Sequence, residues 1–206
     1  MKLSKIFKDY RPQPLFLKDR YAVVLLLVQK GEEVYLLFEK RASNLRNQPG
    51  EISFPGGAIE KGESPREAAI RETMEELQIG KDHLEILGEM DYLIRRDGST
   101  IRAFVGKLQN IDFEEIEPSL AEVESIFAVP LTYFLRQEPK VYKLDAKIQP
   151  EEGFPYEDVP GGRDYPWSKI QEAVYFYYWQ DQIIWGLTAK LTYAFVQILK
   201  NHQGSL

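Results

Sequence analysis

The sequence predicts a mixed α/β fold in which helices cover both faces of a mixed β-sheet, an α/β/α sandwich. Residues 21–28 and 34–38 are apolar runs separated by charged residues and a glycine, which is typical of a hairpin with a buried first strand. Residues 64–77 carry helix-start signals. From Gly186 onwards, apolar residues recur at helical spacing and predict an amphipathic C-terminal helix.

The first predicted helix opens with a capping box. The Ser64 side chain can accept from the backbone N–H of Glu67, the Glu67 side chain can bond back to Ser64, and Pro65 suits the first helical position. We expect this helix to run to about Leu77 and to reach a left-handed stop at Gly80.

More sheet is expected downstream. Strands are predicted over residues 91–95, 100–108, 124–129 and 174–179. Asp97-Gly98 is typical of the tight turn between the first two of these strands. A short helical turn begun by proline is expected over residues 130–135.

The chain length favours a single domain, because 206 residues lie at the upper end of the usual domain size. We therefore predict one domain over residues 1–206. Residues 145–167 concentrate proline, glycine and acids, which indicates a long surface loop inserted into that domain. Such loops often carry substrate specificity.

Charge and cysteine content exclude some classes of protein. The net charge of −6 argues against a protein that grips nucleic acid through its phosphates, so an anionic substrate would need a bound cation or local arginines. The absence of cysteine excludes disulfides and thiolate metal sites. Residues 1–8 lack an apolar signal core and residues 22–28 are too short to span a bilayer, which predicts a cytoplasmic protein without membrane partners.

Three carboxylates gather on the first predicted helix. Glu72, Glu75 and Glu76 are spaced i, i+3 and i+4, which places them on one face. Their mutual repulsion would be relieved by a hard cation, so they predict a metal site; the alternative is a solvated charged face. The opposite face, expected to pack on the sheet, comprises Ile70, Thr73, Met74 and Leu77, with Ala68 and Ala69 leaving room for a diphosphate beside the acids.

The loop before this helix favours the metal interpretation. Phe54-Pro55-Gly56-Gly57 allows close approach of backbone to metal or phosphate. Gly57, Glu63, Arg71-Glu72 and Glu75-Glu76 have the spacing of the Nudix box, so the chain resembles the Nudix hydrolase family. Thr73 and Gln78 depart from the box, which has an aliphatic residue and a glycine at those positions.

The resemblance implies the Nudix fold and a set of roles. Glu72, Glu75 and Glu76 would hold Mg²⁺ or Mn²⁺ with help from the Gly57 carbonyl. In the box, Glu63 would brace Arg71, which makes Arg71 structural.

A second resemblance concerns the substrate. Arg41, Arg46 and Gly50 stand before Phe54 at the spacing of the coenzyme A diphosphatase branch of the family, although Leu37-Phe38-Glu39 replaces the branch's Leu-Leu-Thr. This implies hydrolysis of coenzyme A or a derivative to 3′,5′-ADP and 4′-phosphopantetheine. Arg41 and Arg46, with Gly50 in the loop, would bind substrate phosphates, or they are ordinary surface arginines.

Several alternatives stay open. Glu122 would supply a metal contact or the base that activates water, or it is a surface carboxylate. The substrate could be another nucleoside diphosphate derivative such as NADH or ADP-ribose, or a nucleoside triphosphate. A nucleotide-binding domain without activity is a further alternative, but such domains usually lose box carboxylates, which this chain keeps. The sequence leaves the oligomeric state open.

Overall fold

The computed structural model describes residues 7–8, 10–11 and 15–202, which form two compact units divided after Thr132. The single domain predicted over residues 1–206 stays a prediction. The prediction that residues 1–8 lack a signal core concerns a segment of which the structure describes only residues 7 and 8. Within the described ranges, no helix is both long and apolar enough to cross a membrane.

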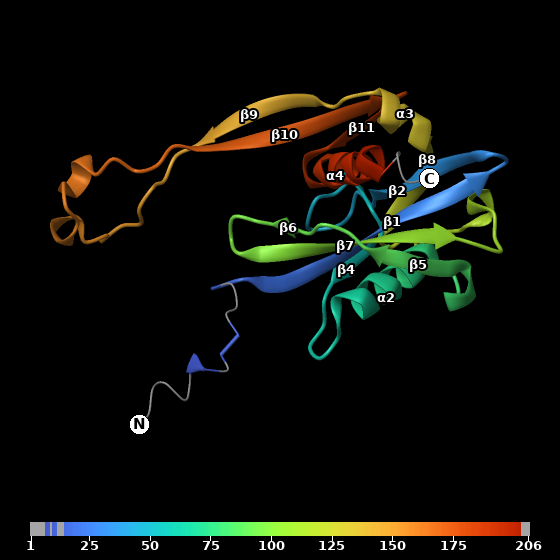
Figure 1. Cartoon of the computed structure of the whole chain (residues 1–206), viewed down its shortest axis with the longest axis horizontal. Helices are drawn as coiled ribbons and strands as arrows, with labels where there is room; N and C mark the ends of the chain where they lie inside the picture. Colours follow the sequence, from blue (N-terminus) through green and yellow to red (C-terminus); the bar gives the residue numbers. More distant parts are fainter. Residues whose placement is uncertain (1–6, 9, 12–14, 203–206) are drawn as a thin grey trace. The chain divides into compact units, whose positions relative to one another are not determined.

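The first unit is built on a mixed sheet (Figure 1). Its strands, within the described part of the chain, are β1 (Lys18–Lys30), β2 (Glu33–Arg41), β3 (Ile52–Ser53), β4 (Gly56–Ala58), β5 (Leu84–Glu89), β6 (Leu93–Ile94), β7 (Ser99–Leu108) and β8 (Val123–Pro130). Strand β1 is parallel to β7 and antiparallel to β2 and β4. The predicted mixed sheet and the hairpin of the first two strands are confirmed, whereas β5 was not predicted.

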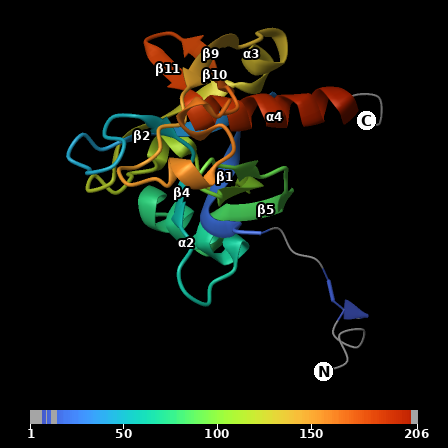
Figure 2. The same cartoon turned by 90° about the vertical axis from the view of Figure 1, so that its left-hand side faces the viewer.

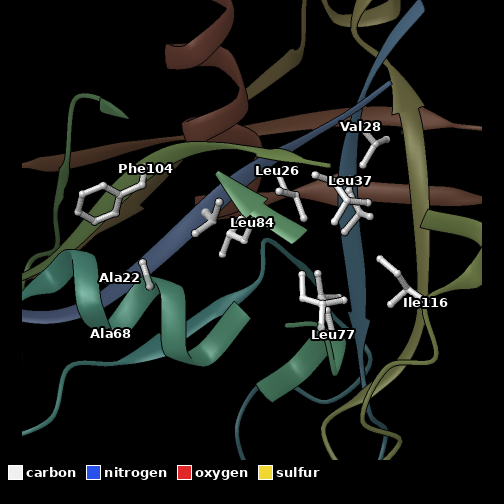
Figure 3. Close-up of a cluster of buried hydrophobic side chains, with 13 residues drawn as sticks. Ala22, Leu26, Val28, Leu37, Ala68, Leu77, Leu84, Phe104 and Ile116 are labelled. Carbon is white, nitrogen blue, oxygen red and sulfur yellow. The ribbon is translucent and has the colours of Figure 1, made fainter. Parts of the chain in front are cut away.

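One face of this sheet is covered by helix α2 (Pro65–Leu77) (Figure 2). Two short 3-10 helices, η1 (Lys81–His83) and η2 (Phe113–Glu115), lie in the connections. Ala68 and Leu77 of α2 point into the same buried cluster as Ala22, Leu26 and Leu37 of the sheet (Figure 3). This cluster fixes the helix against β1 and β2, and it therefore fixes the backbone positions from which the α2 side chains project.

The start of α2 agrees with the sequence and its end does not. Both bonds of the Ser64–Glu67 capping box are present, which confirms the predicted start. The left-handed residue after the helix is Gln78, with φ 51° and ψ 42°, while Gly80 is extended. The predicted stop at Gly80 is wrong because Gln78 closes the helix by donating its N–H to the Met74 carbonyl.

The buried face of α2 also differs from the prediction. Ala68 and Ala69 are completely buried in the core, whereas Ile70 and Met74 are only partly buried against it. Small side chains let the helix approach the sheet closely, so the alanines provide tight packing and leave no room for a diphosphate. Glu76 consequently lies on the buried side.

The second unit contains a three-stranded antiparallel sheet. Its elements are β9 (Lys140–Ala146), β10 (Ile170–Trp179), β11 (Gln182–Trp185) and α4 (Gly186–His202), preceded by α3 (Leu131–Arg136), which spans the division between the units. The strand predicted at 174–179, the helical turn after Pro130 and the C-terminal helix are confirmed. Whether α4 forms the third layer of a sandwich stays a prediction.

The predicted surface loop is confirmed over most of its length. It connects β9 to β10 and contains two short 3-10 turns, η3 (Tyr156–Asp158) and η4 (Gly162–Asp164). Its first two predicted residues, Asp145 and Ala146, instead end strand β9. That strand was not predicted, because all but the last of its residues are exposed and leave no alternating apolar pattern in the sequence.

Candidate functional site

The glycines of β4 bring the loop backbone against α2. Gly56 has a φ of 143°, and a Cβ there would overlap the backbone of Ala22 and Val23 in β1. A Cβ on Gly57 would overlap the carboxylate of Glu72. The Gly57 backbone and the Glu72 carboxylate are therefore neighbours, which is the arrangement that the predicted metal site needs.

Four side chains form what we call the outer group: Glu63, Arg71, Glu72 and Glu75. Arg71 donates from Nε and Nη2 to the two Glu63 oxygens at 2.9 and 3.0 Å, and from Nη1 to Glu72 at 2.9 Å and Glu75 at 3.1 Å. Its Nη2 also donates to the Ala58 carbonyl at 3.1 Å. The guanidinium thus ties the loop to the helix, and its hydrogen bond holds the pKa of Glu63 below the ordinary value.

Two further carboxylates form the inner group, Glu39 and Glu76. Glu76 is 3% exposed and its Oε2 accepts from the Gly56 N–H at 2.7 Å. Glu39 of β2 is 0% exposed and its Oε1 accepts from Ser53 Oγ at 2.8 Å. The two carboxylates lie close enough to share a proton, and burial, followed for Glu76 by the charge of Glu39, raises the pKa of both groups.

Glu39 was missed by the sequence analysis as a site residue. The available signal was an acidic residue directly after the apolar run Leu36-Leu37-Phe38, at the position where the coenzyme A diphosphatase branch has threonine. Leu37 and Glu39 are two residues apart in β2, so their side chains lie on the same face of the sheet, which is the face that α2 covers.

The three box carboxylates do not converge. Successive helical residues turn by about 100°, so Glu75 and Glu76 lie on opposite sides of Glu72. The Glu75 side chain is 58% exposed and turns to Arg71, while Glu76 turns into the core. Among the described residues, no three acidic or histidine side chains stand ready to hold a metal ion. The expected metal site of Glu72, Glu75 and Glu76 therefore stays a prediction, which requires Glu75 to leave Arg71 when an ion binds.

The residues nevertheless fit a divalent cation chemically. The available donors are carboxylate oxygens and the Gly57 carbonyl, which are the hard ligands that Mg²⁺ and Mn²⁺ prefer. One buried carboxylate oxygen, Glu39 Oε2, has no hydrogen-bond donor. Because Gly57 has no side chain, the Glu72 carboxylate can lie directly against the loop backbone.

Two more predicted residues lie near these acids. The charge of Arg41 lowers the pKa of Glu39, and the charge of Glu122 raises the pKa of Glu39, Glu72 and Glu76. Backbone bonds hold the two residues together, since the Ala42 N–H donates to the Glu122 carbonyl at 2.8 Å. The structure thus brings Arg41 and Glu122 to the acidic cluster.

Arg46 and Gly50 lie on the exposed loop that follows Arg41. Gly50 has a φ of 69° and donates its N–H to the Arg41 carbonyl at 3.1 Å, which closes the loop. A glycine suits this left-handed position. The role of Gly50 is therefore to shape the loop, and the exposed Arg46 side chain is free to meet a ligand.

Comparisons with known proteins agree on one family. Residues 18–151, more than half of the chain, match the NUDIX domain. The Uncharacterized Nudix hydrolase NudL of Photorhabdus laumondii is 31% identical over 189 residues, which cover 90% of this chain and 89% of that protein.

Two relatives have names that specify a substrate. The peroxisomal coenzyme A diphosphatase NUDT7 of Mus musculus is 31% identical over 125 residues, or 60% of this chain and 51% of the mouse protein. The peroxisomal coenzyme A diphosphatase ndx-8 of Caenorhabditis elegans is 36% identical over 121 residues, or 57% of this chain and 51% of the nematode protein. The match thus spans about half of each diphosphatase.

Among solved structures, a MutT/nudix family protein from Enterococcus faecalis is similar, with a TM-score of 0.49 and 14% sequence identity. The superposition covers 97% of this chain and 70% of the other.

Proposed function

The chain belongs to the Nudix hydrolase family, and from that membership we propose that it hydrolyses the diphosphate linkage of coenzyme A or its derivatives, releasing 3′,5′-ADP and 4′-phosphopantetheine. The coarser activity follows from the family: the chain is a hydrolase of a nucleoside diphosphate derivative. The observation that carries the coenzyme A proposal is the loop from Arg41 through Arg46 to Gly50, which enters the site directly before Gly57.

Members of this family generally need a divalent metal ion, and we propose Mg²⁺ or Mn²⁺ for this chain. Glu72, Glu75 and Glu76 would hold the ion together with the Gly57 carbonyl. When bound, it would neutralise the diphosphate and lower the pKa of an attacking water. Because an acidic chain repels an anionic substrate, this neutralisation matters for binding as well as for chemistry.

The protein's own groups would do the remaining work. Glu122 would accept the proton of the attacking water or add a metal contact, since its charge already acts on Glu72 and Glu76. Arg71 would hold Glu63 and the loop that contains Gly57 and Ala58, which we call the catalytic loop, in place against α2, and it would not touch the substrate. Its role is structural in this proposal.

Arg41 and Arg46 would divide the phosphates of the substrate between them. Arg41 lies beside the acidic cluster, so it would meet the diphosphate that is being cut. Arg46 is exposed further along the loop and would meet the 3′-phosphate of the ADP moiety. The names of the mouse and nematode relatives support this choice of substrate.

A second candidate is a different nucleoside diphosphate derivative, such as NADH or ADP-ribose. Glu39 favours this second candidate, because the chain has a buried acid at the position where the coenzyme A branch has threonine. A domain that binds nucleotides without cleaving them is favoured less, since Glu72, Glu75 and Glu76 are all kept.

The proposal is tested by comparing kcat/KM for coenzyme A, dephospho-coenzyme A, NADH and ADP-ribose at one Mg²⁺ concentration, with identification of the products. A charge-assisted hydrogen bond is worth about 1.5 to 3 kcal/mol, so loss of the 3′-phosphate should lower kcat/KM by roughly 10- to 150-fold. Arg46→Ala should narrow the gap between the first two substrates.

Arg66→Ala is the matched control, because Arg66 is an exposed arginine on α2 outside the proposed phosphate contacts. It should leave the gap unchanged. A clearly higher kcat/KM for NADH or ADP-ribose would show that the coenzyme A assignment is wrong, while membership of the family would stand.

A further inference from the structure

Glu39 lacks a complete set of partners. It is fully buried in β2, and Ser53 Oγ satisfies only its Oε1. Its Oε2 has no hydrogen-bond donor. Buried carboxylate oxygens in folded proteins are almost always paired, so this oxygen needs either a proton or a bound cation beside it.

The surroundings of Glu39 are acidic. The Glu76 carboxylate lies beside it, Glu122 adds a further negative charge, and Arg41 is the cation that acts on it. Arg41 Nε is itself buried without a partner, so it donates to none of these acids. Two buried carboxylates that face each other need a proton or a cation between them.

Each carboxylate of this pair accepts a hydrogen bond at one oxygen, and the second oxygen of Glu39 has no donor. Ser53 Oγ takes Oε1 of Glu39, and the Gly56 N–H takes Oε2 of Glu76. Donors of this kind orient the ligands in metal sites and leave the other oxygen for the ion. Ser53 lies opposite Glu39 in the register of β2 and β3, so the fold itself fixes this orientation.

We propose that Glu39 is a further ligand of the divalent cation held by Glu76, so that the metal site of this chain extends from α2 onto β2. The inference rests on the proposed metal-binding role of Glu76. It goes beyond the family box, in which all carboxylate ligands come from the helix, and it gives a function to the acid that replaces the threonine of the coenzyme A branch. Hard divalent cations favour carboxylate oxygens of this kind.

The test is Mn²⁺ binding to the full chain without substrate, followed by electron paramagnetic resonance. Glu39→Gln and Glu76→Gln should each raise the Kd of the tightest Mn²⁺ site by at least about tenfold, the scale on which metal-site residues act. The control is Glu124→Gln, which removes an equal charge from an exposed residue of β8 paired with Lys40. Its Kd should stay within about twofold of wild type.

The possible results separate the two ideas. If Glu76→Gln weakens binding and Glu39→Gln does not, the inference about Glu39 is overturned and the proposed metal site stands. That result is also expected if Glu39 only shares a proton with Glu76, because glutamine preserves such a hydrogen bond. If neither variant weakens binding, the metal assignment itself is wrong.

A second variant covers a folding failure of Glu39→Gln. Glu39→Thr introduces the residue of the coenzyme A branch, and the rise in Tm on adding Mn²⁺ is measured instead. The rise should be less than about half of that seen with the wild type and with Glu124→Gln, since a ligand that binds more weakly stabilises less. An undiminished rise would overturn the inference.

Discussion

The outer and inner groups of the site use the same side chain in opposite ways. In the outer group, Glu63, Glu72 and Glu75 surround one arginine at the surface of α2. In the inner group, Glu39 and Glu76 face each other in the core, each with one neutral donor. The pKa of Glu63 is consequently lowered and the pKa of Glu76 is raised.

The comparison shows that the box motif specifies residue types and spacing but not their charge states. Glu63, in the loop before α2, is stabilised as an anion, whereas Glu76, near the end of the same helix, is stabilised in its protonated form. The variants below test whether both groups serve one metal site, and they run from the largest expected effect to the smallest.

Removing one ligand from either group should have the largest effect. Glu75→Gln in the outer group and Glu76→Gln in the inner group should each lower kcat at least about 100-fold at saturating Mg²⁺, because transition-state charge stabilisation is lost. The stabilities should diverge. Without metal, Glu76→Gln should melt no lower than wild type, because its amide can donate to Glu39, whereas Glu75→Gln removes a partner of Arg71.

Turnover close to wild type in either variant would break the link between that group and the metal. The metal site would then consist of ligands from the other group alone, and the idea that both groups contribute ligands to one metal site would be wrong.

Arg71→Ala should damage activity and stability together, because three carboxylates lose their common partner. Loss of a charged hydrogen bond costs about 1.5 to 3 kcal/mol. For a chain of this size, this corresponds to a fall in Tm of roughly 3 to 12 °C. Thermal denaturation and steady-state kinetics of one preparation measure both effects. An unchanged Tm with reduced kcat would assign Arg71 to the chemistry and not to bracing.

Glu63 of the outer group and the two carboxylates of the inner group should respond to pH with opposite sign in the metal-free protein. A raised carboxyl pKa stabilises the fold below the unfolded pKa, and this contribution is lost as pH rises through the folded pKa. The window runs from the ordinary value of 4.5 to about 7 for Glu39 and to about 9 for Glu76. The lowered pKa of Glu63 contributes stability above the ordinary value that is lost as pH falls through the folded pKa.

Tm measured in EDTA should therefore fall between about pH 5 and pH 9, and the fall should be smaller in Glu39→Gln. An equal slope in wild type and variant would show that the inner group holds no proton in the folded protein.

The smallest effect is expected at the end of α2. Gln78 adopts a left-handed conformation that favours glycine, the residue of the family box. Gln78→Gly should raise stability by about 0.5 to 1 kcal/mol, or Tm by roughly 1 to 4 °C, without changing kcat. A change in kcat would show that the helix end, and not only the two groups, controls the position of Glu76.

Local signals in the sequence were sufficient for the elements that depend on local chemistry. The Ser64–Glu67 box, the apolar hairpin strands and the amphipathic spacing of the last helix all predict correctly, because capping and periodicity act between near neighbours. Strand β9 was missed because all but the last of its residues are exposed, so burial leaves little pattern in its sequence.

The site was predictable in its residues and less so in its geometry. The box spacing led us to expect Glu63 against Arg71 and the Gly57 backbone beside the helix carboxylates, and the structure places Glu63 against Arg71 and Gly57 against Glu72. It could not show that Ala68 and Ala69 bring α2 so close to the sheet that Glu76 is buried. Nor could it reveal Glu39, whose contact with Glu76 joins a strand to a helix across the core. Such contacts depend on tertiary packing, which no local pattern encodes.

The parallel pairing of β1 with β7 also has a kinetic consequence. It joins Lys18 to Ser99 and Leu27 to Lys107, so the intervening chain must close into one long loop before the central strands meet. Contacts of such large sequence separation slow folding. We expect this loop closure to limit the rate of folding. Because β4 and its glycines pair with β1, the catalytic loop should reach its final backbone conformation only after the closure.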